Sequence, residues 1–488
     1  MNKYISLFAI FIMLLSFEIQ ALNPHDFIHV GDNITFKKSL GEETIKLSLD
    51  DVIYLGLRNN RNIRSAHLNR IAQKFDLKVM EDSFTPKAII SNNITSIKNN
   101  NDSSLRENLS PEAKILTPYG TRISLGWAYQ HINANHDGVS YSDGVDLNII
   151  QPLLRGAGKN ITTAPITLSK LSEEINKLNL KDIVSQTITQ IIKSYRDLIL
   201  AQEQLKISQD SLNRARQLLE VNKSLISAGR MAEFEIVQTE AEVASQELIH
   251  EETLDRLDSA RLALLQLLSL DLNTSIIATE PLKTTHIDIN KGQALQQAEM
   301  FQPIWLTQLL REKQAEINLS IAKDNRLWDV SLVGGVSQLR NKPSGGSKSN
   351  SMEKYLGVQI EIPIGDLTEK QQEIRSEIDS KNEKIRSNEL KQELERNVIN
   401  SIRNIETLWR QYEISQRSLN LSKRKLDIEK EKLGVGRSSN FQVLSFENDL
   451  RNAENLRVNA LINYLNAQAD LDQVLGTTLQ SWDIKLND

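Results

Sequence analysis

The chain repeats itself, and this repeat limits the folds that it can adopt. Residues 208–213, Ser-Gln-Asp-Ser-Leu-Asn, return at residues 415–420 as Ser-Gln-Arg-Ser-Leu-Asn. The same spacing continues without a gap from about residue 192 to residue 268. It pairs Gly229 with Gly436, Arg230 with Arg437, Phe234 with Phe441, Glu240 with Glu447, Leu254 with Leu461 and Gln266 with Gln473. A match of this length indicates two tandem copies of one structural unit.

The two copies differ in length near their beginnings. Ile63 corresponds to Ile304, so the first copy carries extra sequence between about residues 90 and 150. Each copy then has the layout of a helix, a β-region, a long helix and a second helix, with the longer β-region in the first copy.

The long helices exceed the size of a compact domain. From about residue 165 to residue 226 there is neither proline nor glycine after the opening Pro165. Apolar residues recur every seventh position: Leu205, Leu212, Leu219 and Ile226, and in the second copy Tyr412, Leu419, Leu426 and Leu433. This spacing makes helices supercoil with their neighbours. A helix of ~60 residues is about 90 Å long. The helices alone are also compatible with a cytosolic coiled coil.

Gly229 and Gly436 mark the tips of two α-helical hairpins. Each glycine lies where one long helix ends and another begins, and glycine readily adopts the left-handed conformation that closes a helix. We expect the return helices to span about residues 232–268 and 441–475.

Short segments with strict alternation lie between the helices. The clearest are residues 122–130, 145–149, 328–337 and 355–364. One face of each is apolar and the other is small or polar, which is typical of outer-membrane strands. A half-buried sheet on a soluble core is the alternative. Because crossings come in pairs, we predict two per copy and assign residues 88–97 to a non-spanning extension.

Polar tracts at residues 98–108, 131–143 and 341–352 are expected to be loops. Four strands cannot close a barrel, and an open sheet edge is not tolerated in lipid. Closure therefore requires further copies of the chain.

The N-terminus is typical of a secretory signal at residues 1–21, with Lys3 followed by an apolar run and Ala21 before the cut. An N-terminal membrane anchor is the alternative. After residue 21 no apolar stretch approaches the ~20 residues of a transmembrane helix, so membrane insertion would have to use a β-barrel. The net charge of -5 excludes the basic surface of a nucleic-acid binder, and the absence of cysteine excludes a thioether-linked lipid.

No constellation of catalytic or cofactor-binding residues is present in the sequence. The seven histidines have no metal-ligand spacing on a helix. Residues 156–159, Gly-Ala-Gly-Lys, lack the first glycine and the following Ser or Thr of a phosphate loop. We therefore predict no enzyme activity, no metal and no cofactor.

The chain resembles the TolC family of outer-membrane efflux and secretion ducts over essentially its whole mature length. The resemblance rests on motifs that occur in order and in duplicate. They are Leu-Ser-Leu-Asp-Asp at 47–51 with Asn59-Asn60, Gln-Pro-Leu-Leu-Arg-Gly at 151–156, Glu-Ile-Pro-Ile-Gly at 361–365, and the tips at 228–238 and 435–444. The strand-to-helix passages are thus Pro152 with Gly156 and Pro363 with Gly365.

The resemblance implies a mainly α fold with transmembrane β-structure: a homotrimer with four strands per chain in a 12-stranded barrel, and a helical tunnel through the periplasm. It also implies a periplasmic adaptor (membrane fusion protein) and an inner-membrane transporter as partners, as in a tripartite efflux pump or a type I secretion system. The adaptor is expected to dock at the tips, around Gly229, Arg230, Gly436 and Arg437.

In the best-known type of this family, acidic residues past the second tip form a constriction of the tunnel. The matching positions here are the neutral Gln442 and Ser445, whereas their counterpart past the first tip is Glu235. These three residues are the constriction candidates. A solvated surface glutamate is the alternative for Glu235, and solvated surface arginines are the alternative for Arg230 and Arg437.

The expected organisation has six parts. They are a signal peptide at 1–21, an N-terminal extension at 22–45, a first repeat at 46–275 (helices 46–87 and 153–275, β-region 88–152), a linker at 276–293, a second repeat at 294–476 (helices 294–325 and 365–476, β-region 326–364) and a tail at 477–488. The expected function is passive conduction across the Gram-negative outer membrane. A soluble periplasmic coiled-coil scaffold or adaptor is the alternative, and the sequence does not specify the cargo.

Overall fold

The computed structural model of the chain describes residues 44–98, 103–135, 138–343 and 345–486. The residues from Ile45 onward form one compact unit. The expected signal at 1–21 and nearly all of the expected extension at 22–45 lie outside the described residues.

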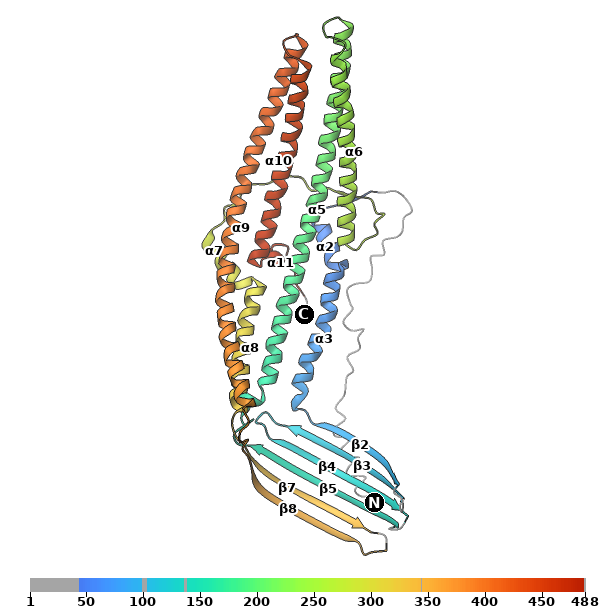
Figure 1. Cartoon of the computed structure of the whole chain (residues 1–488), viewed down its shortest axis with the longest axis vertical. Coiled ribbons are helices and arrows are strands. Elements are labelled where there is room, and N and C mark those ends of the chain that lie inside the picture. Colours follow the sequence, from blue (N-terminus) through green and yellow to red (C-terminus); the bar gives the residue numbers. More distant parts are fainter. Residues whose placement is uncertain (1–43, 99–102, 136–137, 344, 487–488) are drawn as a thin grey trace. The chain divides into compact units, whose positions relative to one another are not determined.

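Two long helical hairpins dominate this unit (Figure 1). In the first, α5 (Ala164–Ser227, 64 residues) returns as α6 (Glu235–Leu267). In the second, α9 (Thr368–Gly434, 67 residues) returns as α10 (Asn440–Leu475). At 1.5 Å per residue, the longer arms are about 96–100 Å long. None of the helices in the described ranges has an apolar stretch of the length that a transmembrane helix requires.

Shorter helices accompany the hairpins. They are α2 (Leu49–Asn59), α3 (Arg61–Glu81), the 3₁₀ helix η2 (Asp82–Phe84), α4 (Lys159–Thr162), α7 (Lys291–Phe301), α8 (Pro303–Asn325) and α11 (Thr478–Ser481). Asn60 separates α2 from α3, because its extended backbone ends the first helix while its side chain accepts from Asn62 N and Ile63 N and caps the second.

The start of the first repeat differs from the expected helix at 46–87. Residues Ile45–Leu47 form strand β1, which pairs in parallel with β6 (Ile276–Ala278) from the expected linker. The buried Tyr195 hydroxyl donates to Leu47 O at 2.9 Å and accepts from Thr279 N at 3.2 Å. This tyrosine fastens both strands to α5.

Six antiparallel strands form a single sheet in the order β2-β3-β4-β5-β7-β8. The strands are β2 (Lys87–Lys98), β3 (Ser103–Leu116), β4 (Arg122–Ala134), β5 (Gly138–Pro152), β7 (Asp329–Lys342) and β8 (Ser349–Glu361). Figure 1 shows them side by side, and no described helix forms a layer on either face.

The expectation of four strands per chain is therefore wrong, although the fold class of long helices with an added β-sheet is confirmed. Residues 88–97 are not a lone extension but pair along their whole length with β3. Of the tract 98–108 expected to be a loop, residues 103–108 belong to β3. The loop expected at 131–143 is also mostly strand, because β4 extends to Ala134 and β5 begins at Gly138. Backbone pairing continues through these polar residues, because the N–H and C=O groups of each strand need hydrogen-bond partners whatever the polarity of the side chains.

The pairing register separates the sheet into an apolar and a polar face, because directly opposed residues point to the same side. One row across the sheet consists of Ala88, Ala113, Leu125, Leu147 and Val336, and ends on β8 at Lys354. The adjacent row, on the opposite face, begins on β2 at Ile89 and continues with Glu112, Gly126, Asp146, Ser337 and Glu353. The predicted alternation of the four segments thus combines into one continuous apolar face.

Candidate functional site

The two hairpin tips have the same backbone geometry. Gly229 follows α5 with φ of +70° and Gly436 follows α9 with φ of +73°. Beyond each glycine an arginine N–H donates back into the helix, from Arg230 to Leu225 O and from Arg437 to Lys432 O, both at 2.8 Å. This is the bonding pattern of a left-handed helix cap, and it explains why glycine occupies both positions.

A fully buried polar triad joins the two hairpins just behind the tips. It consists of Asn222 on α5, Thr239 on α6 and Asn440 on α10. The Asn222 amide donates to Thr239 Oγ1 at 2.7 Å and to Asn440 Oδ1 at 2.8 Å, and the Asn440 amide donates to Thr239 Oγ1 at 3.0 Å. Buried polar groups are costly to leave unpaired, so the triad holds the hairpins in one register.

The sequence analysis missed this triad, although the heptad pattern contains a signal for it. Asn222 follows Leu219 by three residues and precedes Ile226 by four, which is the second seam position of a heptad. A polar residue at a seam position commonly specifies the register and partner of a coiled coil.

Ion pairs of Arg214 also join the hairpins about two to four turns further from the tips, and one pair lies within the second hairpin. Arg214 on α5 contacts Glu447 on α10 at 2.8 Å and Glu454 at 3.4 Å. Lys430 on α9 contacts the same buried Glu447 at 2.6 Å. Burial raises the pKa of Glu454, and the Arg214 guanidinium opposes that rise.

The three constriction candidates lie in the first turns of the return helices. Glu235 opens α6, and its carbonyl oxygen accepts from the Asn440 amide at 3.4 Å. The Gln442 N–H donates to Ser439 Oγ at 3.3 Å, and Ser445 is half-buried one turn later. The structure therefore brings these residues near the polar triad at the tip end of the chain.

The outer surface of the tips combines positive charge with apolar rings. Arg230 and Arg437 are exposed, as are Phe234 and Phe441, which occupy equivalent positions of the two repeats. Val435 beside Gly436 is exposed as well.

The carboxylate of Glu429 binds two side chains at the second tip. Glu429 accepts from the Ser438 hydroxyl at 2.6 Å and from Lys432 Nζ at 3.1 Å. These two hydrogen bonds, that of Ser438 first, hold the pKa of Glu429 below its ordinary value of 4.5. A carboxylate with a lowered folded-state pKa stabilises the fold above its unfolded pKa, and this stabilisation is lost as the pH falls through the folded value.

We therefore expect the tip to stay ordered at pH 4.5 and to loosen only below it. Ser438→Ala removes the main cause of the shift, so loosening should begin at a higher pH. A spin label on Arg437→Cys reports the mobility of the tip, since the chain has no other cysteine. Identical midpoints for the variant and the parent protein would contradict this role of Ser438.

The two strand-to-helix passages differ in their surroundings. In the first, Gly156 N donates to the buried Asp324 carboxylate at 2.7 Å, and Leu153 N, just after Pro152, donates to Val330 O at 2.7 Å. The first passage is thereby tied to α8 and β7. In the second, Pro363 and Gly365 are exposed, and Gly365 has φ of +81°.

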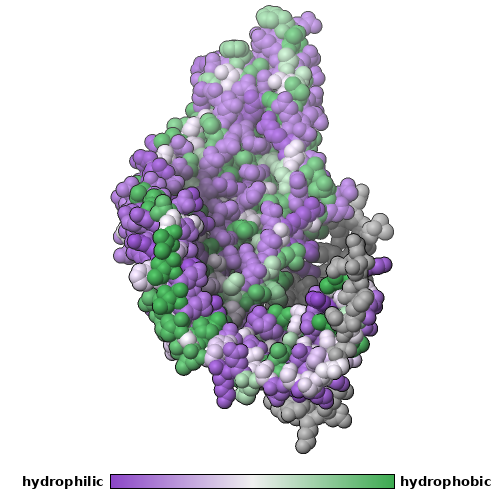
Figure 2. All heavy atoms as spheres, turned by 60° about the horizontal axis from the view of Figure 1, so that its bottom comes forward, coloured by the Kyte–Doolittle hydropathy of each residue, from purple (hydrophilic) through white to green (hydrophobic). Residues whose placement is uncertain are grey.

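Two exposed apolar stripes run along opposite edges of the chain. One lies on α3 and β2 and contains Leu68, Phe75, Val79, Ile90 and Ile94. The other lies on α9 and β8 and contains Leu356, Val358, Ile360, Ile374, Ile378 and Ile385. Figure 2 shows a band of apolar side chains on the left of the molecule, where α9 and β8 lie in Figure 1.

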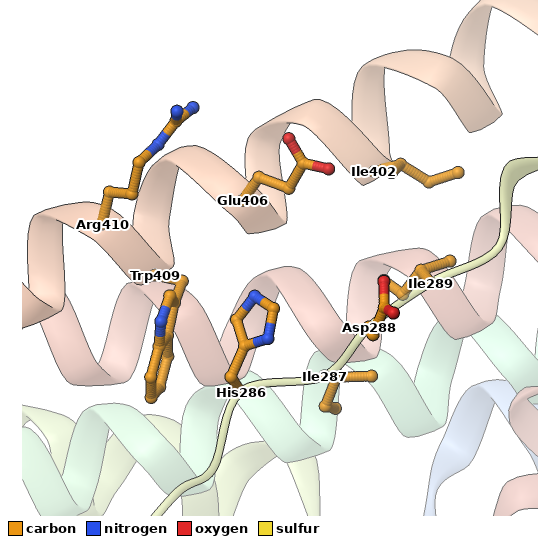
Figure 3. A pocket seen from close by; sticks show the side chains of 8 residues that line it. All are labelled: His286, Ile287, Asp288, Ile289, Ile402, Glu406, Trp409 and Arg410. Atoms are coloured by element: carbon orange, nitrogen blue, oxygen red, sulfur yellow. The ribbon is translucent and has the colours of Figure 1, made fainter.

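A pocket of about 270 Å³ lies where the segment between β6 and α7 crosses α9. Figure 3 shows His286 facing Trp409, while Arg410 points away from it. The two rings pack at a centroid distance of 5.3 Å. Among the residues that the structure describes, no group of three His, Asp or Glu side chains is placed to hold a metal ion.

Comparison with known proteins places the second repeat in one family. Residues 294–477 match the family model described as outer membrane efflux protein. No curated protein sequence matches the chain.

Solved structures share the fold over most of the chain. The CmeC outer membrane channel of Campylobacter jejuni is 18% identical, with a TM-score of 0.66 over 88% of this chain and 86% of that one. The outer membrane protein VceC of Vibrio cholerae is 14% identical, with a TM-score of 0.67 over 88% and 96%. The MtrE outer membrane channel of Neisseria gonorrhoeae, solved in its open state, is 16% identical, with a TM-score of 0.66 over 88% and 89%.

Proposed function

Because the chain carries an outer membrane efflux protein domain on the fold of the TolC-family channels, we propose that three copies of it form an outer-membrane duct for an efflux pump or a type I secretion system. The duct conducts substrates passively from a periplasmic adaptor and an inner-membrane transporter to the exterior. The observation that carries this proposal is the uncovered amphipathic sheet between two unpaired edges.

The two edges support closure into a ring. Strands β2 and β8 each pair on one side only, and the exposed apolar stripes of α3 and α9 continue these edges along the helices. The edges differ in sequence, so one copy joins the next head to tail, and such contacts generate a ring where the rotation between copies closes. Closure of the ring gives the edge N–H and C=O groups of β2 and β8 hydrogen-bond partners, which lipid does not provide.

The tips supply the surface for the adaptor. Equivalent rings, Phe234 and Phe441, are exposed beside the cationic Arg230 and Arg437. Aromatic and arginine side chains are enriched where proteins bind one another. The adaptor thus docks on both tips of each copy.

Three copies of Glu235 form an acidic constriction near these tips, flanked by the neutral Gln442 and Ser445. Glu235 lies in the first turn of α6, where the helix dipole favours a negatively charged side chain. The duct performs no chemistry, and the energy for transport comes from the transporter.

A soluble periplasmic scaffold is the competing function. It leaves the continuous apolar face of the sheet in contact with water, since no described helix covers that face. Large contiguous apolar patches are uncommon on the surface of soluble monomers.

The test is conduction by the purified protein. Protein extracted from outer membranes with detergent should insert into planar bilayers and give discrete ion-conducting steps. A protein that osmotic shock releases from the periplasm, and that leaves bilayers unaltered, would overturn the proposal.

A further inference from the structure

We propose that each copy contributes all six strands of its sheet to the wall of the barrel, so that three copies build a wall of 18 strands and not 12. This inference rests on the proposed function and concerns the hairpin of β2 and β3, which belongs to the longer β-region of the first repeat.

The hairpin is fully integrated into the sheet. Strand β3 pairs with β4 at both ends of their contact, from Ser104 opposite Ala134 to Leu116 opposite Arg122. The ladder is interrupted only around Pro111, which has no N–H to donate. Strands β2 and β3 have 12 and 14 residues, close to the 14 and 13 residues of β7 and β8.

The hairpin also continues the apolar face of the sheet. On β3 this face carries Leu105, Leu109, Pro111, Ala113 and Ile115, together with Glu107, which lies opposite His131. The other face carries Arg106, Asn108, Ser110, Glu112 and Lys114. On β2 the apolar face carries Ile90 and Ile94, which are 69% and 61% exposed. A hairpin outside the wall would hold these side chains in water, so their placement favours contact with lipid.

The edges of the six-stranded sheet are suited to each other. Neighbouring strands alternate in direction, so β2 and β8 run antiparallel, as closure through β8 of one copy and β2 of the next requires. A 12-stranded wall would instead need β4 to give up its pairing with β3 and to pair with β8 of a neighbour. That exchange would leave β3 with a new open edge, which lipid does not tolerate.

The strand number determines the width of the duct. At ~4.8 Å between strands and a tilt of about 40°, 18 strands give a backbone diameter of about 36 Å, against about 24 Å for 12 strands. The cross-section is then roughly twice as large, which suits a bulky cargo such as a polypeptide.

Cysteine pairs distinguish the two walls, because the natural chain contains no cysteine. One series combines Val358→Cys on β8 with Ala88→Cys, Ile90→Cys or Asn92→Cys on β2. All four positions lie on the apolar face. Three positions on β2 are used because the pairing register between β8 of one copy and β2 of the next has to be found. The second series combines Val358→Cys with Ile123→Cys or Leu125→Cys on β4.

In oxidised outer membranes, we expect a pair of the first series to give covalent dimers and trimers on non-reducing gels, and the second series to give none. Crosslinks in the second series alone, or in neither series of a protein that conducts, would overturn the 18-stranded wall. A chain that remains monomeric and does not conduct would overturn the proposed function itself.

A matched pair of arginine substitutions tests independently whether the hairpin of β2 and β3 spans the membrane. Leu109→Arg places a charge on the apolar face of β3, and Asn108→Arg places one on the polar face of the same strand. If the hairpin spans the membrane, Leu109→Arg should lower the amount of inserted oligomer at least tenfold, while Asn108→Arg should change it less than twofold. Equal insertion of the two variants would contradict the inference.

Discussion

Replacing Glu173 by glutamine should lower the free energy of unfolding by about 3–5 kcal/mol, because it removes the negative charge of a buried ion pair with Arg70. Glu173 on α5 binds the Arg70 guanidinium of α3 through both oxygens, with Nη1 and Oε2 at 2.6 Å. The two side chains are only 6% and 9% exposed. The measurement is the denaturant concentration at which the detergent-extracted oligomer unfolds.

A second ion pair between the same helices serves as the control. Lys170 on α5 contacts Glu81 on α3 at 3.4 Å, and the two side chains are 59% and 49% exposed. Surface pairs contribute about 0–1 kcal/mol, so Lys170→Gln should change the stability little. Equal effects of Glu173→Gln and Lys170→Gln would show that burial of the Arg70–Glu173 pair has no special role.

The second large effect is expected at the tip triad. Asn440→Ala leaves the Asn222 amide and the Thr239 hydroxyl with an unmet hydrogen bond in a fully buried place. Each such group costs about 1–3 kcal/mol, which changes a two-state equilibrium between closed and separated hairpins roughly 5- to 150-fold. The variant should therefore conduct more in planar bilayers, with spin labels at Ser227→Cys and Arg437→Cys moving apart.

Asn455→Ala is the matched control for this experiment. Asn455 lies on the same helix α10, but its amide donates to Arg451 O within that helix at 3.0 Å. It joins no second hairpin, so its loss should leave both conductance and label distance unchanged. Equal conductance of Asn440→Ala and the parent protein would contradict the role of the triad in holding the tips together.

Periodicity made the fold class predictable from sequence, whereas the resemblance to a family rested on motifs that occur in order and in duplicate. The fold class is confirmed, since the seven-residue seams and the alternating segments each encode a solvent preference that the fold satisfies. The resemblance to the TolC family agrees with the family model that matches residues 294–477 and with the fold of the solved channels. Leu125 and Leu147, predicted on separate strands, lie directly opposite each other on the apolar face.

Strand β3 could not be recognised in the same way. Its alternation of Leu109 and Ala113 with Ser110 and Lys114 is interrupted by Glu107 and by a proline at 111, so it reads as a polar loop. Backbone hydrogen bonds to β2 and β4 stabilise β3 as a strand. Such long-range pairing leaves no signal in the local sequence. The triad of Asn222, Thr239 and Asn440 was not predicted for a related reason. Its contacts join the two hairpins, so they depend on how the two repeats pack.

The central claim is that copies of this chain join edge to edge into a closed ring in the outer membrane. Native mass spectrometry of the detergent-extracted protein tests it most directly. A single species with three times the mass of the mature chain is expected. A monomer under the gentlest extraction, with β2 and β8 both accessible to added peptides, would contradict the account.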